Sequence, residues 1–63
     1  MDKARILVVD DDKEIANAID KLLTLEGFEV IKAYNGFEAL DALVVNSIQL
    51  ILLDLLNQMG YFY

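Results

Sequence analysis

The chain has 63 residues, a formal net charge of −6 and a hydrophobic fraction of 57%, and it contains neither cysteine nor histidine. This length allows one domain, residues 1–63, which would bury only about 60% of the surface that its unfolded form exposes. Disulfides and zinc sites built on thiolate or imidazole are excluded, and the five basic residues are too scattered for nucleic-acid binding.

The apolar content exceeds the value of about 45–50% that is usual for soluble domains, so we expect self-association. No apolar run is long enough to span a bilayer, and the N-terminus lacks the pattern of a signal peptide. The sequence therefore predicts a cytoplasmic protein without a membrane partner.

The first half of the chain predicts a strand followed by a helix. Residues 4–9 form a short run of branched apolar side chains, typical of a central parallel strand covered on both faces. Residues 13–26 have helical periodicity and end at Gly27, where a left-handed residue suits a helix end. The spacing of Asp11 and Glu14 has the form of an acidic capping pair. The expected core face of this helix consists of Ile15, Ala18, Ile19, Leu22 and Leu23.

The second half predicts a strand, a helix and a further strand. Residues 28–34 mix apolar and charged side chains, which suits an edge strand. Asn35 is expected to cap a helix, with Glu38 three residues on, and Asn46 with Ser47 to close it. Residues 49–53 form a last apolar strand. This alternation predicts an α/β fold with right-handed parallel crossovers.

Aspartates follow the first and last predicted strands. Asp10, Asp11 and Asp12 come directly after one apolar run, and Asp54 comes directly after the other. The carboxyl ends of parallel strands meet at one edge, and clustered carboxylates there suit a hard cation such as Mg²⁺. Asp54 would then be a nucleophile able to form an acyl phosphate. Alternatively, Asp11 or Asp12 caps the first helix and the acids are solvated.

Four segments together resemble the receiver domain of bacterial two-component response regulators. They are ILVVDDD at 6–12, GFEV at 27–30, AYNG at 33–36 and LILLDL at 50–55. The resemblance implies half of a doubly wound, flavodoxin-like parallel sheet with the order βαβαβ and strand order 2-1-3. It covers residues 3–56, which correspond to the first half of a receiver, so we expect a truncated receiver domain.

The resemblance also implies the roles of four residues. Asp54 matches the phosphoacceptor, Asp10 and Asp11 match the acidic pair that holds Mg²⁺, and the carbonyl of Leu56 matches the backbone metal ligand. After Asp54 the family continues with a Pro-Gly loop, whereas this chain has LLNQM at 55–59 and then Gly60. The Ser or Thr and the Lys that contact the phosphoryl group in the family have no counterpart here, so we expect impaired phosphotransfer.

Three functions compete at this stage. The first is a Mg²⁺-dependent aspartyl phosphoacceptor in phosphorelay signalling, with a sensor histidine kinase or a full-length regulator as partner. The second is an assembly module without chemistry, which homodimerises into a six-stranded sheet and leaves the terminal aromatic residues 61–63 either frayed or in the interface. The third is a fragment without a cellular role. An enzyme with turnover ranks lowest, because no general base is visible.

Overall fold

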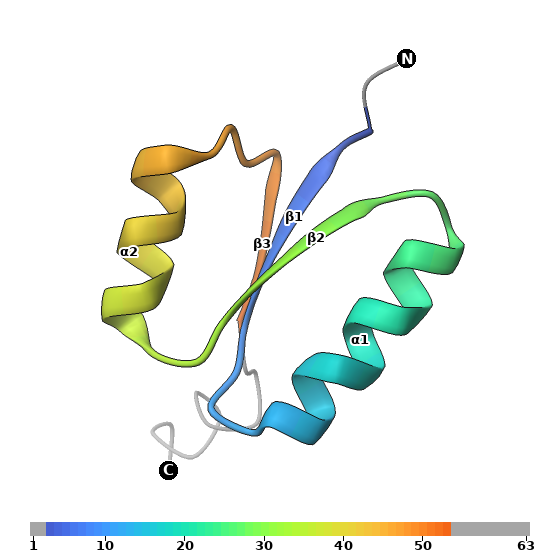
Figure 1. Cartoon of the computed structure of the whole chain (residues 1–63), viewed down its shortest axis with the longest axis horizontal. Helices are drawn as coiled ribbons and strands as arrows, with labels where there is room; N and C mark the ends of the chain where they lie inside the picture. The colour runs from blue at the N-terminus through green and yellow to red at the C-terminus, as the bar shows by residue number, and fades with distance from the viewer. Residues whose placement is uncertain (1–2, 54–63) are drawn as a thin grey trace, which may run out of the picture.

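The computed structural model describes residues 3–53, which form a three-stranded parallel sheet with two helices. The elements are β1 (Arg5–Val9), α1 (Lys13–Leu25), β2 (Glu29–Ala33), α2 (Gly36–Val45) and β3 (Leu50–Leu53). The strand order is β2-β1-β3, and the two helices lie on opposite faces of the sheet (Figure 1). The predicted α/β class, the order βαβαβ and the strand order 2-1-3 are confirmed.

Strand β1 forms the centre of the core. Ile6, Leu7 and Val8 are almost completely buried, and the side chain of Leu7 has no exposed surface. Successive side chains of a strand point to opposite faces. Accordingly, Ile6 and Val8 pack with α1, whereas Leu7 packs with Ala42 of α2. The expected burial of this strand on both faces is confirmed.

The start of α1 decides between two residues that the sequence left open as its cap. Asp12 is the N-cap, and the capping pair of Asp11 with Glu14 is not formed: Oδ1 of Asp12 accepts hydrogen bonds from the backbone N–H of Glu14 at 2.9 Å and of Ile15 at 3.3 Å. Asp12 has extended backbone angles, φ −91° and ψ 108°, which turn its carboxylate toward the free N–H groups of the first helical turn. Asp11 lies one residue before the cap and is exposed.

The face of α1 that packs on the sheet also differs from the expected one. Ala16 is fully buried and Ile19 and Leu23 pack beside it, whereas Ile15 and Leu22 are exposed. The small side chain of Ala16 lets the helix approach β1 and β2, its contacts in the sheet. The packing face is therefore centred on residues 16, 19 and 23, and part of the expected face points away from the core.

Two turns have the predicted residues. Gly27 ends α1 with φ +95°, a left-handed conformation that costs glycine little because it has no Cβ. Asn35 caps α2 by accepting a hydrogen bond from the N–H of Glu38 at 2.9 Å, and the Glu38 carboxylate accepts one from the N–H of Tyr34 at 2.7 Å. Asn46 is the C-cap of α2.

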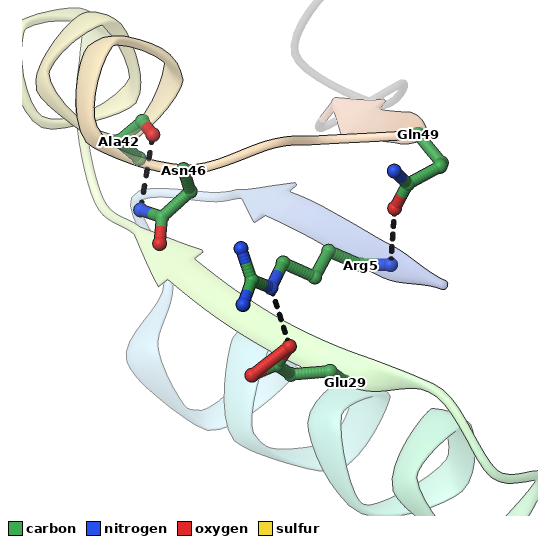
Figure 2. Close-up of polar contacts among 5 residues, drawn as sticks. All are labelled: Arg5, Glu29, Ala42, Asn46 and Gln49. Carbon is green, nitrogen blue, oxygen red and sulfur yellow. Dashed lines mark hydrogen bonds and ion pairs between the residues drawn. The ribbon is translucent and has the colours of Figure 1, made fainter. Parts of the chain in front are cut away.

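Polar contacts tie the strands together at their amino ends (Figure 2). The backbone N–H of Arg5 donates to Oε1 of Gln49 at 2.6 Å, and its guanidinium Nε pairs with Glu29 at 2.5 Å. Nearby, Nδ2 of Asn46 donates to the carbonyl of Ala42 at 3.0 Å. Arg5 thus links β1 to β2 through Glu29 and to the residue directly before β3 through Gln49. Both contacts lie at the end of the sheet opposite to the aspartates.

Strand β3 is the least covered strand among the described residues. Leu50, Ile51 and Leu53 are exposed by 52%, 42% and 46%. The backbones of both helices lie close to β1 and β2 and not to β3, and Leu52 is the residue of β3 that packs against the core cluster of Ile6, Val8 and Ala16. Within residues 3–53, β3 is therefore paired with β1 on one side and has apolar side chains open to solvent.

Candidate functional site

The candidate site lies at the carboxyl end of the sheet. Val9, at the end of β1, is in register with Ala33 of β2 and with Leu53 of β3. The loops that lead from β1 into α1 and from β2 into α2 lie at this same end (Figure 1). Asp10 and Asp11 belong to the first of these loops. Asp54 and Leu56 lie outside the described residues, as do the aromatic residues 61–63, so their predicted roles stay predictions.

Asp10 is a buried carboxylate in a defined position. Only 5% of the residue is exposed, and its backbone N–H donates to the carbonyl of Ala33 at 3.0 Å, which continues the pairing of β1 with β2 by one residue. Its Oδ1 accepts a hydrogen bond from the backbone N–H of Asp12 at 2.9 Å. Among the described residues, nothing donates to Oδ2. Within residues 3–53, Asp10 therefore combines a fixed orientation with an oxygen to which no described group donates.

The three consecutive aspartates have separate roles. Asp10 is buried, Asp11 is exposed at a bend, and the carboxylate of Asp12 caps α1. In residues 3–53, no group of three or more acidic, histidine or cysteine side chains is arranged to hold a metal ion. Asp10 and Asp11, the acidic pair that the sequence predicted, therefore lie directly after β1, and the carboxylate of Asp12 is engaged as the cap of α1.

The donor atoms present fit magnesium better than a softer metal. Asp10 and Asp11 supply carboxylate oxygens, and Mg²⁺ takes oxygen ligands, typically one or two carboxylates with water in the remaining positions. A carboxylate has about four lone-pair positions, and the single hydrogen bond described at Asp10 occupies one of them. The described half of the predicted ligand set is therefore compatible with the ion that the sequence predicts.

The sequence placed Lys13 near the acids, as a solvated side chain or a contact for a phosphoryl group, but it did not predict the contact that Lys13 makes with an aromatic ring. The ammonium group of Lys13 lies over the ring of Tyr34, 5.3 Å from its centroid. Lys13 begins α1 and Tyr34 directly follows β2, so the contact joins the two loops at the carboxyl end. A cation over an aromatic face stabilises by about 0.5–1 kcal/mol at exposed sites. Such a contact between residues far apart in the chain leaves no signal in a single sequence.

A hollow of about 730 Å³ lies at the other end of the sheet. It is open to solvent, and Arg5, Glu29 and Gln49 are among its lining residues. Arg5 and Glu29 are paired with each other, which leaves this hollow without a concentration of one charge. We do not take this hollow as the functional site, because the buried carboxylate of Asp10 lies at the opposite, carboxyl end of the sheet.

A parallel α/β sheet with acidic residues after its central strand defines the class of protein. Ligand sites of such sheets lie outside the carboxyl ends of the strands. The family model of the response regulator receiver domain matches residues 6–60. The chain belongs to the response regulator receiver domain family, as its sequence predicted.

Known relatives agree with this assignment. The transcriptional regulatory protein CpxR of Escherichia coli (strain K12) is 50% identical over 52 residues, which are 82% of this chain and 22% of CpxR. The uncharacterized transcriptional regulatory protein YrkP of Bacillus subtilis is 44% identical over 52 residues, again 82% of this chain and 22% of the relative. PrrA of Mycobacterium bovis is 43% identical over 51 residues, or 81% of this chain and 22% of that protein.

The chain spans about a fifth of the length of these curated relatives. No solved structure matches it significantly. Among residues 3–53, no helix is both long enough and apolar enough to cross a membrane. The chain is a receiver domain of the response regulators, which act in two-component signalling.

Proposed function

We propose that this receiver domain accepts a phosphoryl group on Asp54. A carboxylate oxygen of Asp54 forms a bond to phosphorus as the bond from phosphorus to the donor breaks, and the donor leaves with that electron pair. For a small acyl phosphate, the leaving group is a carboxylate. A sensor histidine kinase is the proposed physiological donor, since the chain belongs to a family that acts in two-component signalling.

We further propose that Asp10, Asp11, Asp54 and the carbonyl of Leu56 hold Mg²⁺. Bound there, the ion would supply positive charge against the negative charge of the phosphoryl group. Asp10 contributes an oxygen whose position is set by the pairing of β1 with β2, and Asp11 contributes an exposed carboxylate beside it.

The buried, oriented carboxylate of Asp10 is the observation that supports this function best. Burial of an ionised carboxylate costs free energy unless hydrogen bonds or a cation compensate for it. Here the N–H of Asp12 supplies one hydrogen bond, and one oxygen is left without a described donor. The preceding strand β1 contains the buried apolar residues Ile6, Leu7 and Val8, so a buried carboxylate directly after it stands out from its surroundings.

The test is incubation with Mg²⁺ and a small acyl phosphate, followed by intact mass measurement. We expect one phosphoryl adduct that is absent from Asp54→Asn and strongly reduced in Asp10→Asn. Asp41→Asn is the matched control, because Asp41 is an exposed aspartate on α2, outside the loops at the carboxyl end. An adduct that persists in Asp54→Asn, or no adduct after hours, would refute the proposal.

A second candidate function is assembly without phosphotransfer, in which the chain homodimerises or binds a kinase or a full-length regulator. The exposed apolar side chains favour it. Among the described residues, eleven large apolar side chains are exposed, on α1, α2 and β3. Burial of such a side chain is worth about 1.5–3 kcal/mol when complete, and association costs about 4–15 kcal/mol. Several of them must therefore be covered together, and sedimentation over a range of concentrations would detect the dimer.

The remaining expectations from the sequence stay predictions. We propose a phosphoacceptor in the cytoplasm that consumes one donor per phosphorylation, and not an enzyme with turnover. Nucleic-acid binding is not proposed for residues 3–53, since the two ion pairs found there already engage Arg5 and Lys32 with carboxylates.

A further inference from the structure

We infer that Asn35 is a site of spontaneous deamidation in the folded chain, with the exposed backbone nitrogen of Gly36 as the nucleophile. The two residues belong to the turn that leads from β2 into α2, at the carboxyl end of the sheet (Figure 1). The modification goes beyond the proposed phosphotransfer and assembly and depends on neither. Three features support it: the exposure of the pair, the unpaired N–H of Gly36 and the hydrogen bond to the Asn35 side chain.

The reaction joins two neighbouring groups of the main chain and side chain. A solvent base removes the proton from the backbone nitrogen of Gly36, and this nitrogen forms a bond to Cγ of Asn35. The bond from Cγ to Nδ2 breaks, and Nδ2 leaves as ammonia after it takes up a proton from water. Water then adds to one of the two carbonyl carbons of the cyclic imide and breaks its bond to the nitrogen. Residue 35 becomes aspartate or isoaspartate, depending on which bond is broken.

The pair is accessible and uncrowded. Asn35 and Gly36 are both exposed. A Cβ placed at Gly36 would meet no atom within 4 Å, so no neighbouring group blocks the nucleophile. Glycine also lacks a side chain of its own that would hinder the approach of its nitrogen to Cγ. Asparagine is among the thermolabile residues of proteins, and this one has the least steric protection that a following residue can give.

The attacking nitrogen has no hydrogen bond to lose. Gly36 is the first residue of α2, and the first N–H groups of a helix have no partner within it. Among the described residues, no group accepts a hydrogen bond from this N–H. The cyclic imide lacks the hydrogen, as proline does, and proline is tolerated at the first position of a helix for that reason. Ring closure therefore removes no backbone hydrogen bond of α2.

The start of α2 stabilises the negative charge that develops during the attack. The N-terminus of a helix carries partial positive charge, which favours an anion close to it. As the nitrogen attacks, charge moves onto Oδ1 of Asn35, and the N–H of Glu38 already donates to this oxygen at 2.9 Å. A donor directed at an oxygen that becomes negative lowers the barrier. The hydrogen bond that caps the helix therefore also supports the reaction.

The other described asparagines lack this combination. Asn17 lies inside α1, and its Oδ1 accepts a hydrogen bond from the ammonium group of Lys32 at 2.7 Å. Asn46 is half-buried, and its Nδ2 donates to the carbonyl of Ala42 at 3.0 Å. Each is followed by a residue with a Cβ, alanine in one case and serine in the other. Within residues 3–53, we therefore expect deamidation to be concentrated at Asn35.

The two products differ in their effect on α2. Aspartate keeps an oxygen that can accept from the N–H of Glu38 and adds a negative charge, and both suit an N-cap. Isoaspartate leads the main chain through Cβ and lengthens the connection between β2 and α2 by one atom, which displaces the cap. We expect this product to loosen the packing of Ala39 and Ala42 with Leu7. Both products add one negative charge to a chain of formal net charge −6.

Peptide mapping by mass spectrometry tests the site. The folded chain is incubated in mildly alkaline buffer, and the conversion of each asparagine to the acid is followed with time. We expect Asn35 to convert at least tenfold faster than Asn17 and Asn46. Gly36→Ala is the matched variant, because it keeps Asn35 and the net charge and adds a Cβ in open space. It should slow the conversion of Asn35 at least tenfold.

Several outcomes would overturn the inference. Equal rates at the three asparagines, or an unchanged rate in Gly36→Ala, would remove the role of the glycine nitrogen. Conversion of Asn35 in urea with none in the folded chain would assign the reaction to the unfolded state alone. Melting curves test the products: Asn35→Asp should melt no lower than the unmodified chain, whereas the isoaspartate fraction, separated by reversed-phase chromatography and refolded, should melt lower. The reverse order would contradict the effects assigned to the cap.

Discussion

Substitution of Asp12 tests the division of roles among the three aspartates. Its Oδ1 accepts hydrogen bonds from the N–H groups of Glu14 at 2.9 Å and Ile15 at 3.3 Å, and loss of such a cap costs about 1 kcal/mol, within a range of about 0.5–2. For a domain of this size, 1 kcal/mol lowers the melting temperature by about 4–8 °C. Asp12→Ala should therefore melt several degrees lower, and Asp12→Asn, which keeps a capping acceptor, should retain most of the stability.

Asp11→Ala is the comparison that isolates the cap. Asp11 is exposed and makes no capping hydrogen bond, so its removal should change the free energy of unfolding by at most about 0.5 kcal/mol. Thermal unfolding followed by circular dichroism measures these differences, at one protein concentration because self-association would shift the midpoint. The reasoning is refuted if Asp11→Ala destabilises more than Asp12→Ala, or if Asp12→Asn loses as much as Asp12→Ala.

Four further predictions concern stability and association. Leu7→Ala removes a fully buried side chain and should cost about 2–5 kcal/mol, enough to unfold most molecules at room temperature, as a urea titration would show. Gly27→Ala should destabilise by about 1 kcal/mol or more because of its φ of +95°, although no atom lies near the added Cβ. Gly36→Ala, equally open but without positive φ and inside α2, should stabilise by about 0.4–1 kcal/mol in the same melts. Lys32→Leu removes the charge from the β2 face and should increase light scattering at high concentration, whereas unchanged scattering would show that this charge does not protect the edge.

The sequence was sufficient for the order of elements, because local signals agreed with the global fold. The apolar run at residues 4–9 and the helical periodicity at 13–26 differ clearly in period. Gly27 and Asn35 marked turns through requirements of the backbone, a left-handed φ in one case and a side-chain acceptor in the other. Each observed strand and helix boundary lies within one residue of its predicted position.

Details that depend on backbone angles or on packing could not be predicted. Asp11 and Asp12 are identical residues in adjacent positions, and only the observed φ and ψ of Asp12 show which carboxylate reaches the helix. Periodicity likewise gave an apolar arc of α1 without its orientation. The helix packs closely on the sheet at Ala16, and this orientation leaves Ile15 and Leu22 exposed. The contact of Lys13 with Tyr34 depends on the conformations of the loop before α1 and of the loop after β2, so it could not be predicted from the sequence either.

The geometry of the acidic site couples helix capping to the orientation of Asp10. Asp12 uses two different groups: its side chain caps α1, and its backbone N–H donates to Oδ1 of Asp10. Replacement of the Asp12 side chain therefore removes the cap and leaves the hydrogen bond to Asp10 available. Stability and metal binding should then respond differently, since Asp12→Ala lowers the melting temperature while Asp10→Asn lowers the affinity for Mg²⁺. Because all three residues belong to one loop that β1 and α1 hold in place, the candidate site requires both elements to be folded.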